Sequence, residues 1–423
     1  MSFDWTDETL GDLISRDEAH LQTGPFGTAL KASEYSEDGV PLISVREIRE
    51  GFLQIVEDTP RVCEATTQRL PKFLLQQGDI VFGRKGAVDR NAVISFEQEG
   101  WFLGSDGIRL RLSNKYDSLF FSYLMRSSAT RAWLLQNSEG TTMLSLNQKT
   151  LARVPVRYPT VEIQKRISTQ LRTLDDKITL NIKINQTLEQ MAQAIFKSWF
   201  VDFDPVKAKM NGEQPEGMDA ATASLFPEKL VESELGLIPD GWEVKPFSEW
   251  VKITKGKNIT KKTIVDGDVP VVAGGLKPAY FHNAHNVDGP AITISASGAN
   301  AGYVNLYFEN IWASDCSYIS QSTTPLFFLQ YVALRYNQKK IFDMQTGAAQ
   351  PHIYPRDFER LMIVVPNEEL CRKLEEVFAS FFRTVANNKQ QNIDLAALRD
   401  TLLPKLLSGE IELGQAQELA EVE

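Results

Sequence analysis

A stretch without proline or glycine, between Pro159 and Pro205, constrains the fold more than any other feature of the sequence. Because these two residue types usually end helices, the stretch predicts a single long helix. Thr160 can cap its first turn, and Glu162 suits the positive end of the helix dipole. Apolar residues alternate at spacings of three and four residues along it: Leu171, Leu174, Ile178, Leu188, Ala192 and Ile195. This spacing indicates a coiled-coil seam, so the helix needs a partner along its length.

The pattern of this stretch returns at an offset of 207 residues, where Pro366 takes the place of Pro159. The seam is repeated by Phe378, Phe381, Val385, Leu395 and Leu402. Arg399 stands where the first copy has Ala192, so the last turns need not pair ideally. The chain is therefore predicted to be a duplication in which a long helix closes each copy.

Four asparagines interrupt the two seams at equivalent positions: Asn181, Asn185, Asn388 and Asn392. A buried asparagine is costly unless it is paired, so it fixes register and partner at the expense of stability. If the two helices pack antiparallel, these residues are predicted to fix the register of one helix against the other. The alternative is that the helices are rotated slightly and the asparagines face solvent.

With 423 residues, the chain is too long for one ordinary core and suits two or three domains. Strand-like runs and amphipathic segments before the first long helix predict a mixed α/β head, and the second copy repeats this order. A polar segment rich in small residues separates the copies and reads as a connector. The predicted first head, first helix, connector, second head, second helix and tail are residues 1–157, 158–204, 205–237, 238–365, 366–412 and 413–423.

Cysteine content and hydropathy predict a cytoplasmic protein without membrane contact. Cys63, Cys316 and Cys371 are scattered and odd in number, which fits a reducing compartment better than a disulfide framework. The acidic segment Met1–Leu10 lacks the apolar core of a secretion signal, and no apolar run is long enough to span a membrane. The net charge of −10 argues only weakly against nucleic-acid binding, because local patches decide binding.

Sequence motifs for catalysis are missing. Phosphate-binding loops, the GxGxxG opening and the Asn-Pro-Pro-aromatic stretch of adenine methyltransferases do not occur. His282 and His285 form an HxxH pair without the further ligands of a metal site, so surface histidines are the simpler interpretation. Asp202 and Asp204 lie between aromatic residues at a helix end and are better explained as helix-terminating residues. We therefore expect no catalytic residue, metal or cofactor in this chain.

Basic and polar loop residues are suited to contact an anionic polymer. Arg84, Lys85 and Arg90 flank glycines that let the backbone approach a ligand closely, and lysines are dense from Lys252 to Lys262. Lysine and arginine on phosphates set affinity, whereas Arg, Asn and Gln on base edges set sequence choice. The candidate nucleic-acid-binding residues are Lys31, Arg84, Lys85, Arg90, Lys149, Lys255, Lys257, Lys261, Lys262, Asn300, Gln350 and His352. The alternative for each of them is a solvated surface position.

A further pair of loops is equivalent by the offset of 207 residues: Gly140–Met143 in the first copy and Gly347–His352 in the second. Both loops precede the strand that leads into a long helix. They are candidates for the same contact, with structural packing as the alternative.

At three runs the chain closely resembles the specificity subunits of type I restriction–modification systems. The first run is Ala194–Val206, which contains the sequence AIFKSWFVDFDPV. The second is Leu235–Trp242, with the sequence LGLIPDGW, and the third is Leu402–Ile411, with the sequence LLPKLLSGEI. The resemblance extends over nearly the whole chain, including the order head, helix, head, helix, while the heads match in outline only.

The resemblance implies an α+β fold with two pseudo-repeated mixed α/β target recognition domains, separated by two long helices packed as an antiparallel coiled coil. Each domain is expected to read one half of a bipartite, asymmetric site in double-stranded DNA, and the helices, about 60 Å long, are expected to act as a spacer. The chain itself is expected not to be an enzyme. Two methyltransferase subunits acting on adenine N6 and ATP-dependent restriction subunits are the expected partners, and S-adenosylmethionine, ATP and Mg would belong to them.

Aromatic residues crowd the end of the first long helix: Phe196, Trp199, Phe200 and Phe203. If they are uncovered, they predict a partner-docking surface; packing against a head is the alternative. Two other classes of function stay open at this point. One is an enzyme that modifies or cleaves DNA by itself, and the other is a coiled-coil scaffold without DNA contact.

Overall fold

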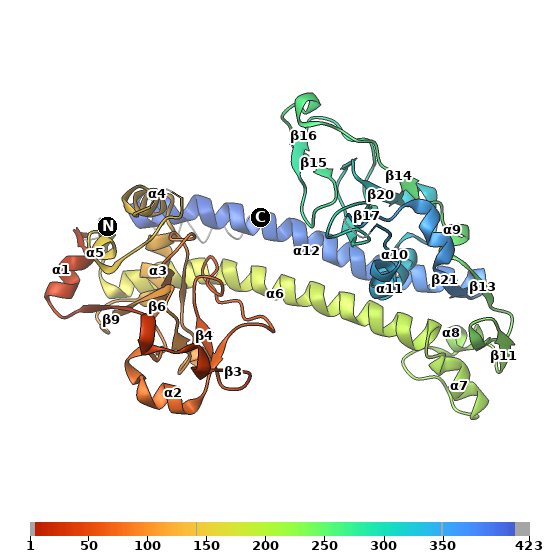
Figure 1. Cartoon of the computed structure of the whole chain (residues 1–423), viewed down its shortest axis with the longest axis horizontal. Coiled ribbons are helices and arrows are strands. Elements are labelled where there is room, and N and C mark those ends of the chain that lie inside the picture. Colours follow the sequence, from red (N-terminus) through yellow and green to blue (C-terminus); the bar gives the residue numbers. More distant parts are fainter. Residues whose placement is uncertain (1–4, 141, 348–349, 411–423) are drawn as a thin grey trace. The chain divides into compact units, whose positions relative to one another are not determined.

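The computed structural model describes residues 5–140, 142–347 and 350–410. Within them the chain forms two compact units, one from residues up to Thr179 together with those from Asn392 onward, the other from Leu180–Gln391. The division between the units runs through both long helices, α6 (Val161–Phe200) and α12 (Glu368–Ser408) (Figure 1). Each unit is therefore a head packed on one half of each long helix.

The first unit is built on an antiparallel sheet with the strand order β2-β9-β6-β7. A second sheet has the order β3-β5-β4-β8, in which β4 and β8 are parallel. Strand β1 pairs with β10, which leads into α6. The strands are β1 (Thr6–Thr9), β2 (Ala19–Thr23), β3 (Tyr35–Ser36), β4 (Val40–Ile43), β5 (Arg61–Val62), β6 (Ile80–Gly83), β7 (Asn91–Val93), β8 (Phe102–Leu103), β9 (Gly107–Leu112) and β10 (Pro155–Tyr158).

Helices of the first head join this sheet to the long helices. Its α-helices are α1 (Leu10–Ser15), α2 (Glu64–Arg69), α3 (Ser118–Arg126), α4 (Ser128–Asn137) and α5 (Gln148–Ala152). Phe120 and Phe121 of α3 are fully buried in one apolar cluster with Leu171 of α6 and Leu402 of α12. The head is thus held to both helices by hydrophobic burial, the dominant favourable term in folding.

The second unit repeats this architecture. Its antiparallel sheet has the order β14-β20-β17-β18, and a smaller sheet, β16-β15-β19, again contains one parallel pair. Strand β13 pairs with β21, which precedes α12, as β1 does with β10. The strands are β13 (Glu243–Pro246), β14 (Thr254–Lys255), β15 (Val269–Val272), β16 (Tyr280–His282), β17 (Ala291–Ser295), β18 (Val304–Tyr307), β19 (Trp312–Ala313), β20 (Cys316–Ser320) and β21 (Met362–Val365). The predicted fold class, a duplicated α+β chain with two long helices, is confirmed.

The segment between the two copies is structured. It contains α7 (Asp204–Met210), α8 (Ala220–Ser224) and a hairpin of β11 (Leu230–Ser233) with β12 (Gly236–Pro239). Val206 and Phe226 are buried in the core of the second unit. The segment predicted to be a connector therefore contributes to that core through its few apolar side chains.

Further helices complete the second head: α9 (Phe247–Trp250), α10 (Phe327–Tyr336) and α11 (Gln338–Asp343). Helix α10 is capped from α12, since the carboxyl of Glu375 accepts hydrogen bonds from the backbone N–H groups of Phe328 (3.1 Å) and Leu329 (2.8 Å). In the first unit, by contrast, Asp117 caps α3 from within its own segment. Burial raises the pKa of Glu375 to about 7.

The ends of the long helices have local causes. Helix α6 begins where the carbonyl of Thr160 accepts from the N–H groups of Ile163 and Gln164, and it stops before Phe203, whose φ of 57° is left-handed. Helix α12 contains Pro404 in its last turns and ends at Ser408. Positions 411 and 412 of the predicted second helix, and the predicted tail 413–423, lie outside the described residues.

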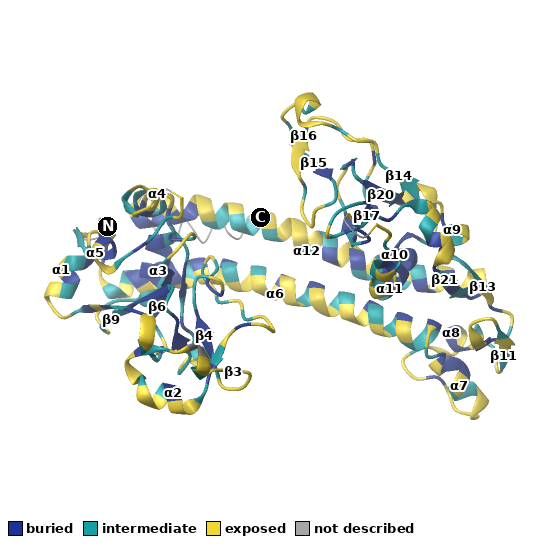
Figure 2. Ribbon diagram, in the orientation of Figure 1, coloured by how far each residue is buried: buried dark blue, intermediate teal, exposed yellow. Residues whose placement is uncertain are grey.

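Along both helices, burial follows the predicted seams (Figure 2). Leu171 and Ala192 of α6 and Phe378 and Val385 of α12 are almost completely buried, whereas residues off the seam, such as Lys183, are exposed. Arg399, the exception in the second seam, forms an ion pair of 2.7 Å with Asp175 in the first unit. In place of an apolar contact, the seam there contains a charge pair.

Candidate nucleic-acid interface

In the first unit, four loops meet at the end of the main sheet where β2 and β6 finish and β9 begins. Backbone hydrogen bonds join them. The N–H of Gly24 donates to the backbone carbonyl of Gly107 (3.1 Å), and the N–H of Arg84 donates to that of Asp106 (2.9 Å). The carbonyl of Arg84 in turn accepts from the N–H of Leu146 (2.8 Å). We call residues 23–26, 84–86, 104–106 and 144–146 the first loop cluster. A Cβ atom at Gly24 would lie 1.9 Å from the carbonyl oxygen of Gly104, so only glycine permits this approach.

The second unit has the same arrangement, which we call the second loop cluster: residues 255–258, 296–298, 313–315 and 350–354. The backbone N–H of Ala296 donates to the backbone carbonyl of Asp315 (3.2 Å), as that of Arg84 does to the carbonyl of Asp106 in the first cluster. The N–H of Ile353 donates to Ala296 (3.0 Å), as Leu146 does to Arg84. A Cβ atom at Gly256 would lie 2.4 Å from the carbonyl oxygen of Ser314. Glycine is therefore needed at the same place in both clusters.

The side chains of the first cluster combine two cations with an aromatic ring. The guanidinium of Arg84 lies 4.4 Å from the ring centroid of Phe26 and donates to the carbonyl of Ser105 (3.2 Å). The ammonium of Lys85 is 3.3 Å from the carboxylate of Asp106. Lys85 and Phe26 are exposed, and Arg84 is half-buried, so all three are accessible to a ligand at this end of the sheet.

Different side chains occupy the second cluster. The ammonium of Lys255 lies 5.2 Å from the ring centroid of Tyr354, which in turn packs against His352. The imidazole Nε2 of His352 is 2.9 Å from the hydroxyl of Thr346. The carboxylate of Asp315 accepts a hydrogen bond from Ser297, where its counterpart Asp106 pairs with Lys85. Exposed Lys257 and Gln350 complete the cluster.

The structure brings six of the twelve sequence-predicted residues into the two clusters, and a seventh borders the first cluster. These are Arg84, Lys85, Lys255, Lys257, Gln350 and His352, together with Arg90, which borders the first cluster because its carbonyl accepts from the N–H of Gly83 (3.2 Å). Five lie apart. Lys31 is exposed in a loop before the 3₁₀ turn Ala32–Glu34, Lys149 lies on α5, Lys261 and Lys262 lie on the 3₁₀ turn Lys261–Thr263, and Asn300 lies in the turn between β17 and β18.

Sequence reasoning missed the aromatic members of the clusters. Phe26 follows a Gly-Pro dipeptide at the end of a strand, which is an unusual place for an exposed ring and could have signalled a contact. Its partner Arg84 lies far away in the sequence, so their contact could not be predicted without the fold. The same holds for Lys255 and Tyr354.

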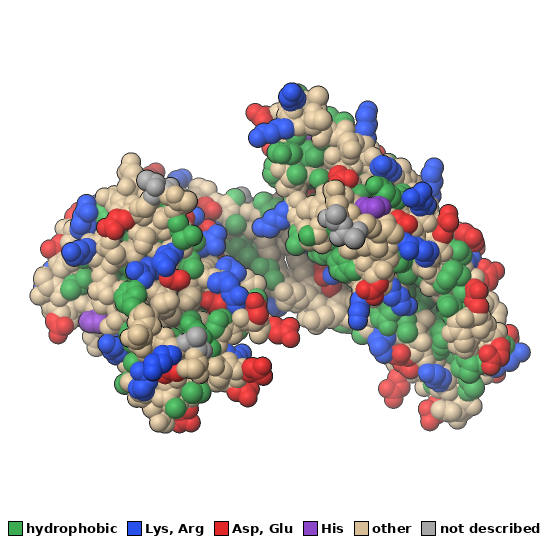
Figure 3. Space-filling model, viewed as in Figure 1, with side chains coloured by type: hydrophobic (Ala, Val, Ile, Leu, Met, Phe, Trp, Pro, Cys, Tyr) green, Lys and Arg blue, Asp and Glu red, His purple; other side chains and the backbone are tan. Residues whose placement is uncertain are grey.

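Charge on the surface is mixed. Figure 3 shows Lys and Arg side chains interspersed with Asp and Glu on the face of each unit in view. In the first cluster one acidic side chain, Asp106, offsets one of the two cations, and in the second Asp315 bonds to a neutral hydroxyl. The clusters are therefore locally cationic although the chain carries a net charge of −10.

The aromatic residues at the end of α6 are covered. Phe196, Phe200 and Phe203 are buried in the core of the second unit, and Trp199 is half-buried and packs against that core. The ring of Trp199 contacts Phe226 edge-on at 5.1 Å, and that of Phe203 contacts Trp242 at 5.9 Å. The prediction of an uncovered docking surface here is wrong, because the segment after α6 folds over these rings and buries the three phenylalanines, leaving Trp199 only partly exposed.

The seam asparagines form direct contacts between α6 and α12 in the second unit. The amide of Asn388 donates to the side-chain carbonyl of Asn185 (2.8 Å), and the amide of Asn181 donates to Gln391 (2.8 Å). Asn181 and Asn185 are buried, so these groups do not face solvent. Because the earlier residue of α6 pairs with the later residue of α12, the two segments are antiparallel. The fourth asparagine, Asn392, is half-buried.

The predicted surface histidines and helix-end aspartates have structural partners. The prediction of a surface position is wrong for His282, which is buried on β16 with its Nδ1 3.1 Å from the backbone of Val265. His285 is exposed and lies 3.1 Å from Asp288. Asp202 pairs with Lys197, and Asp204 accepts from Ser198 (2.8 Å). Within residues 5–140, 142–347 and 350–410, no group of three or more His, Cys, Asp or Glu could hold a metal ion. Of the described helices, none is long and apolar enough to cross a membrane.

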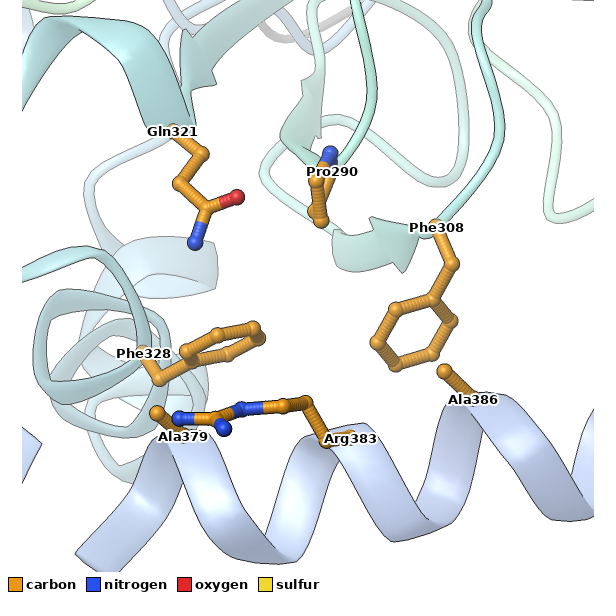
Figure 4. Close-up of a pocket in the computed structure, with 7 residues that line it drawn as sticks. All are labelled: Pro290, Phe308, Gln321, Phe328, Ala379, Arg383 and Ala386. Atoms are coloured by element: carbon orange, nitrogen blue, oxygen red, sulfur yellow. The ribbon is translucent and has the colours of Figure 1, made fainter. Parts of the chain in front are cut away.

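A pocket of about 470 Å³ lies in the second unit, against one face of α12 (Figure 4). Ala379, Arg383 and Ala386 of α12 form one wall, and Phe308 and Phe328 flank it. Two further lining residues, Pro290 and Gln321, lie at the start of β17 and just after β20. Because the second loop cluster is at the opposite ends of these two strands, the pocket is separate from it.

Comparisons with known proteins identify the family. The model of the type I restriction modification DNA specificity domain matches residues 4–190 and 239–397, one segment in each copy. The HindI specificity subunit of Haemophilus influenzae is 28% identical over 357 residues, covering 69% of this chain and 77% of that protein. The MjaIX specificity subunit of Methanocaldococcus jannaschii is 24% identical over 412 residues, covering 90% and 89%.

A solved structure supports the fold. The S subunit of a type I restriction-modification system from M. genitalium aligns with a TM-score of 0.57 over 96% of both chains, at 17% sequence identity. At that identity the likeness concerns the fold, and it agrees with the duplicated arrangement of heads and long helices. The family assignment comes from the sequence matches, which include most of the chain. The chain therefore belongs to the type I restriction–modification DNA specificity family.

Proposed function

We propose that this specificity subunit recognises a bipartite, asymmetric site in double-stranded DNA, reading one half with each loop cluster. The observation that carries the proposal is the repetition of one backbone frame with different side chains. The backbone hydrogen bond from Arg84 to Asp106 is equivalent to that from Ala296 to Asp315, and Gly24 is equivalent to Gly256. A shared frame suits a shared task, binding to duplex DNA.

The side chains at equivalent positions differ, which supports two different half-sites. Arg84 of the first cluster corresponds to Ala296, and Lys85 to Ser297. Hydrogen-bonding side chains on base edges determine sequence choice, whereas lysines on phosphates position the protein without selecting a sequence. Two identical readers would recognise a symmetric site, so the difference between the clusters favours an asymmetric one.

Partner subunits would supply the chemistry. We propose that the chain directs two adenine-N6 methyltransferase subunits and ATP-dependent restriction subunits to the site, and that S-adenosylmethionine, ATP and Mg bind to those partners. The chain itself would not catalyse either reaction. Purified alone and incubated with duplex DNA and S-adenosylmethionine, it should transfer no methyl group; transfer by the single chain would instead favour an enzyme acting alone.

An exchange of heads tests the proposal. Replacing residues 1–157 by the first head of a relative should change one half of the methylated sequence in a host that carries the partner subunits. The other half, and the strand on which it is methylated, should remain as in the parent. A matched exchange of residues 238–365 should change only the second half. If either exchange alters both halves, or neither, the assignment of one half-site to each cluster is wrong.

A further inference from the structure

The first loop cluster contains an arginine–phenylalanine pair that the second lacks at the equivalent positions, since the Lys255–Tyr354 contact of the second cluster involves other positions. The guanidinium of Arg84 lies 4.4 Å from the ring centroid of Phe26, close enough for a cation–π contact. Phe26 corresponds to Asn258 in the second cluster, because each lies two residues after the equivalent glycine. Arg84 corresponds to Ala296 through the shared backbone hydrogen bond. The pair is thus a property of one reader and not of the shared frame.

Both members of the pair are positioned to reach a ligand. The ring of Phe26 is 52% exposed, although a phenylalanine in a loop gains nothing from exposure. Arg84 has five N–H donors, and among the described residues its side chain donates to the carbonyl of Ser105 only. That bond and the ring of Phe26 fix the plane of the guanidinium, which leaves its remaining donors directed by the protein rather than by solvent.

The chemistry of these two side chains selects particular bases. Arginine forms a bidentate pair with O6 and N7 of guanine in the major groove, and phenylalanine makes apolar contact with the methyl group of thymine. Successive base pairs are about 3.4 Å apart along the duplex. Two side chains stacked at 4.4 Å therefore match two neighbouring base pairs better than they match one pair or two distant ones.

We propose that Arg84 and Phe26 read adjacent base pairs, with Arg84 on a guanine and Phe26 on the methyl group of the neighbouring thymine. The half-site of the first unit then contains a G·C pair next to an A·T pair. The half-site of the second unit carries no such requirement from the equivalent positions, Asn258 and Ala296. This inference rests on the proposed function, because it assumes that the first loop cluster faces DNA.

Mapping of N6-methyladenine in a host that carries the chain with its partner subunits tests the pair. Arg84→Ala should relax the motif at the guanine only, with discrimination there falling on the order of ten- to a hundred-fold. Phe26→Ala should relax the neighbouring A·T position by a smaller factor. Arg84→Lys should restore part of the preference for guanine, and Phe26→Leu should restore part of that for thymine, because each keeps the relevant chemistry.

Two matched variants in the same unit control for general effects. Arg157 lies 5.3 Å from the ring of Trp5 in a comparable stack near β1 and β10, and Phe96, 70% exposed, follows the end of β7 opposite the first loop cluster. Arg157→Ala and Phe96→Ala should leave every position of the motif unchanged. The second half-site should also be unchanged in all six variants, which separates loss of reading from loss of folding.

The outcomes distinguish this inference from the function on which it rests. A gapped motif whose first half lacks a G·C pair next to an A·T pair overturns the inference and leaves the proposed function intact. The inference is likewise overturned if the motif has this step but Arg84→Ala and Phe26→Ala methylate the parental sequence alone. If the wild-type chain directs no gapped methylation in the presence of its partners, both the inference and the proposed function are wrong.

Discussion

The hydrogen bond between Asn185 and Asn388 predicts a stability coupling between α6 and α12 that a double-mutant cycle can measure. Asn185 is 8% exposed, and its side-chain carbonyl accepts from the amide of Asn388 at 2.8 Å. Asn388→Ala removes the donor and leaves a buried acceptor unpaired, which costs about 1–3 kcal/mol. Replacing both asparagines by leucine removes both polar groups and extends the apolar seam, so it should be nearly neutral or stabilising.

Urea denaturation of the full chain, followed by far-UV circular dichroism, gives the free energies of the second unit's transition. Asn388→Ala and Asn185→Ala should each lower this free energy of unfolding. The double alanine variant should lose about 1 kcal/mol less than the sum of the two single losses. Lys183→Ala, an exposed site two residues from Asn185, should change it by less than about 0.5 kcal/mol. Additive single effects, or a double leucine variant as unstable as Asn388→Ala, would refute the reasoning.

Three further predictions concern the cluster glycines, the lysines of the turn Lys261–Thr263, which lies outside the clusters, and the cap of α10. Gly24→Ala should distort the first cluster and destabilise its unit by about 1–3 kcal/mol, because the new Cβ would lie 1.9 Å from the carbonyl oxygen of Gly104. Methylation mapping should then show a relaxed first half-site only, and Gly256→Ala should relax the second half-site only. Lys261→Ala with Lys262→Ala should weaken binding of the assembled complex to all sequences and flatten the slope of log K against log salt by about 2, measured by fluorescence anisotropy. The pKa of Glu375 is raised to about 7, so the folded state binds this proton more tightly than the unfolded state does. The stabilisation from the protonated carboxyl is therefore complete below about pH 4.5, and the free energy of unfolding falls by up to about 3 kcal/mol as the pH rises to 7. Urea titrations at several pH values should show this fall, and it should be absent in Glu375→Gln.

Much of the frame could be predicted from the sequence because it is periodic. The absence of Pro and Gly between Pro159 and Pro205, and the repeat at an offset of 207 residues, specify two long helices with apolar seams, and the structure has them as α6 and α12. The helix ends are harder to predict. Proline alone usually breaks a helix, yet Pro404 lies inside α12, as the predicted range 366–412 requires. Packing of the last turns against the first head outweighs the lost hydrogen bond.

The clusters themselves could be predicted only in part. Glycines and basic residues such as Arg84 and Lys85 identify loops that can approach an anionic ligand, whereas the contact between Arg84 and Phe26 depends on how strands β2 and β6 lie in the sheet. The aromatic residues around Trp199 show the reverse error. Their density suggested an exposed surface, but composition does not reveal which following segment will cover a helix end.

The most direct test of bipartite recognition is single-molecule mapping of N6-methyladenine across the genome of a host, with and without this chain. We predict that methylation at one two-part, gapped, asymmetric motif disappears when the chain is absent and returns when it is supplied. The partner methyltransferase should be present and able to bind S-adenosylmethionine in both strains. Methylation that is unchanged by removal of the chain, or that follows a short continuous motif, would contradict the account.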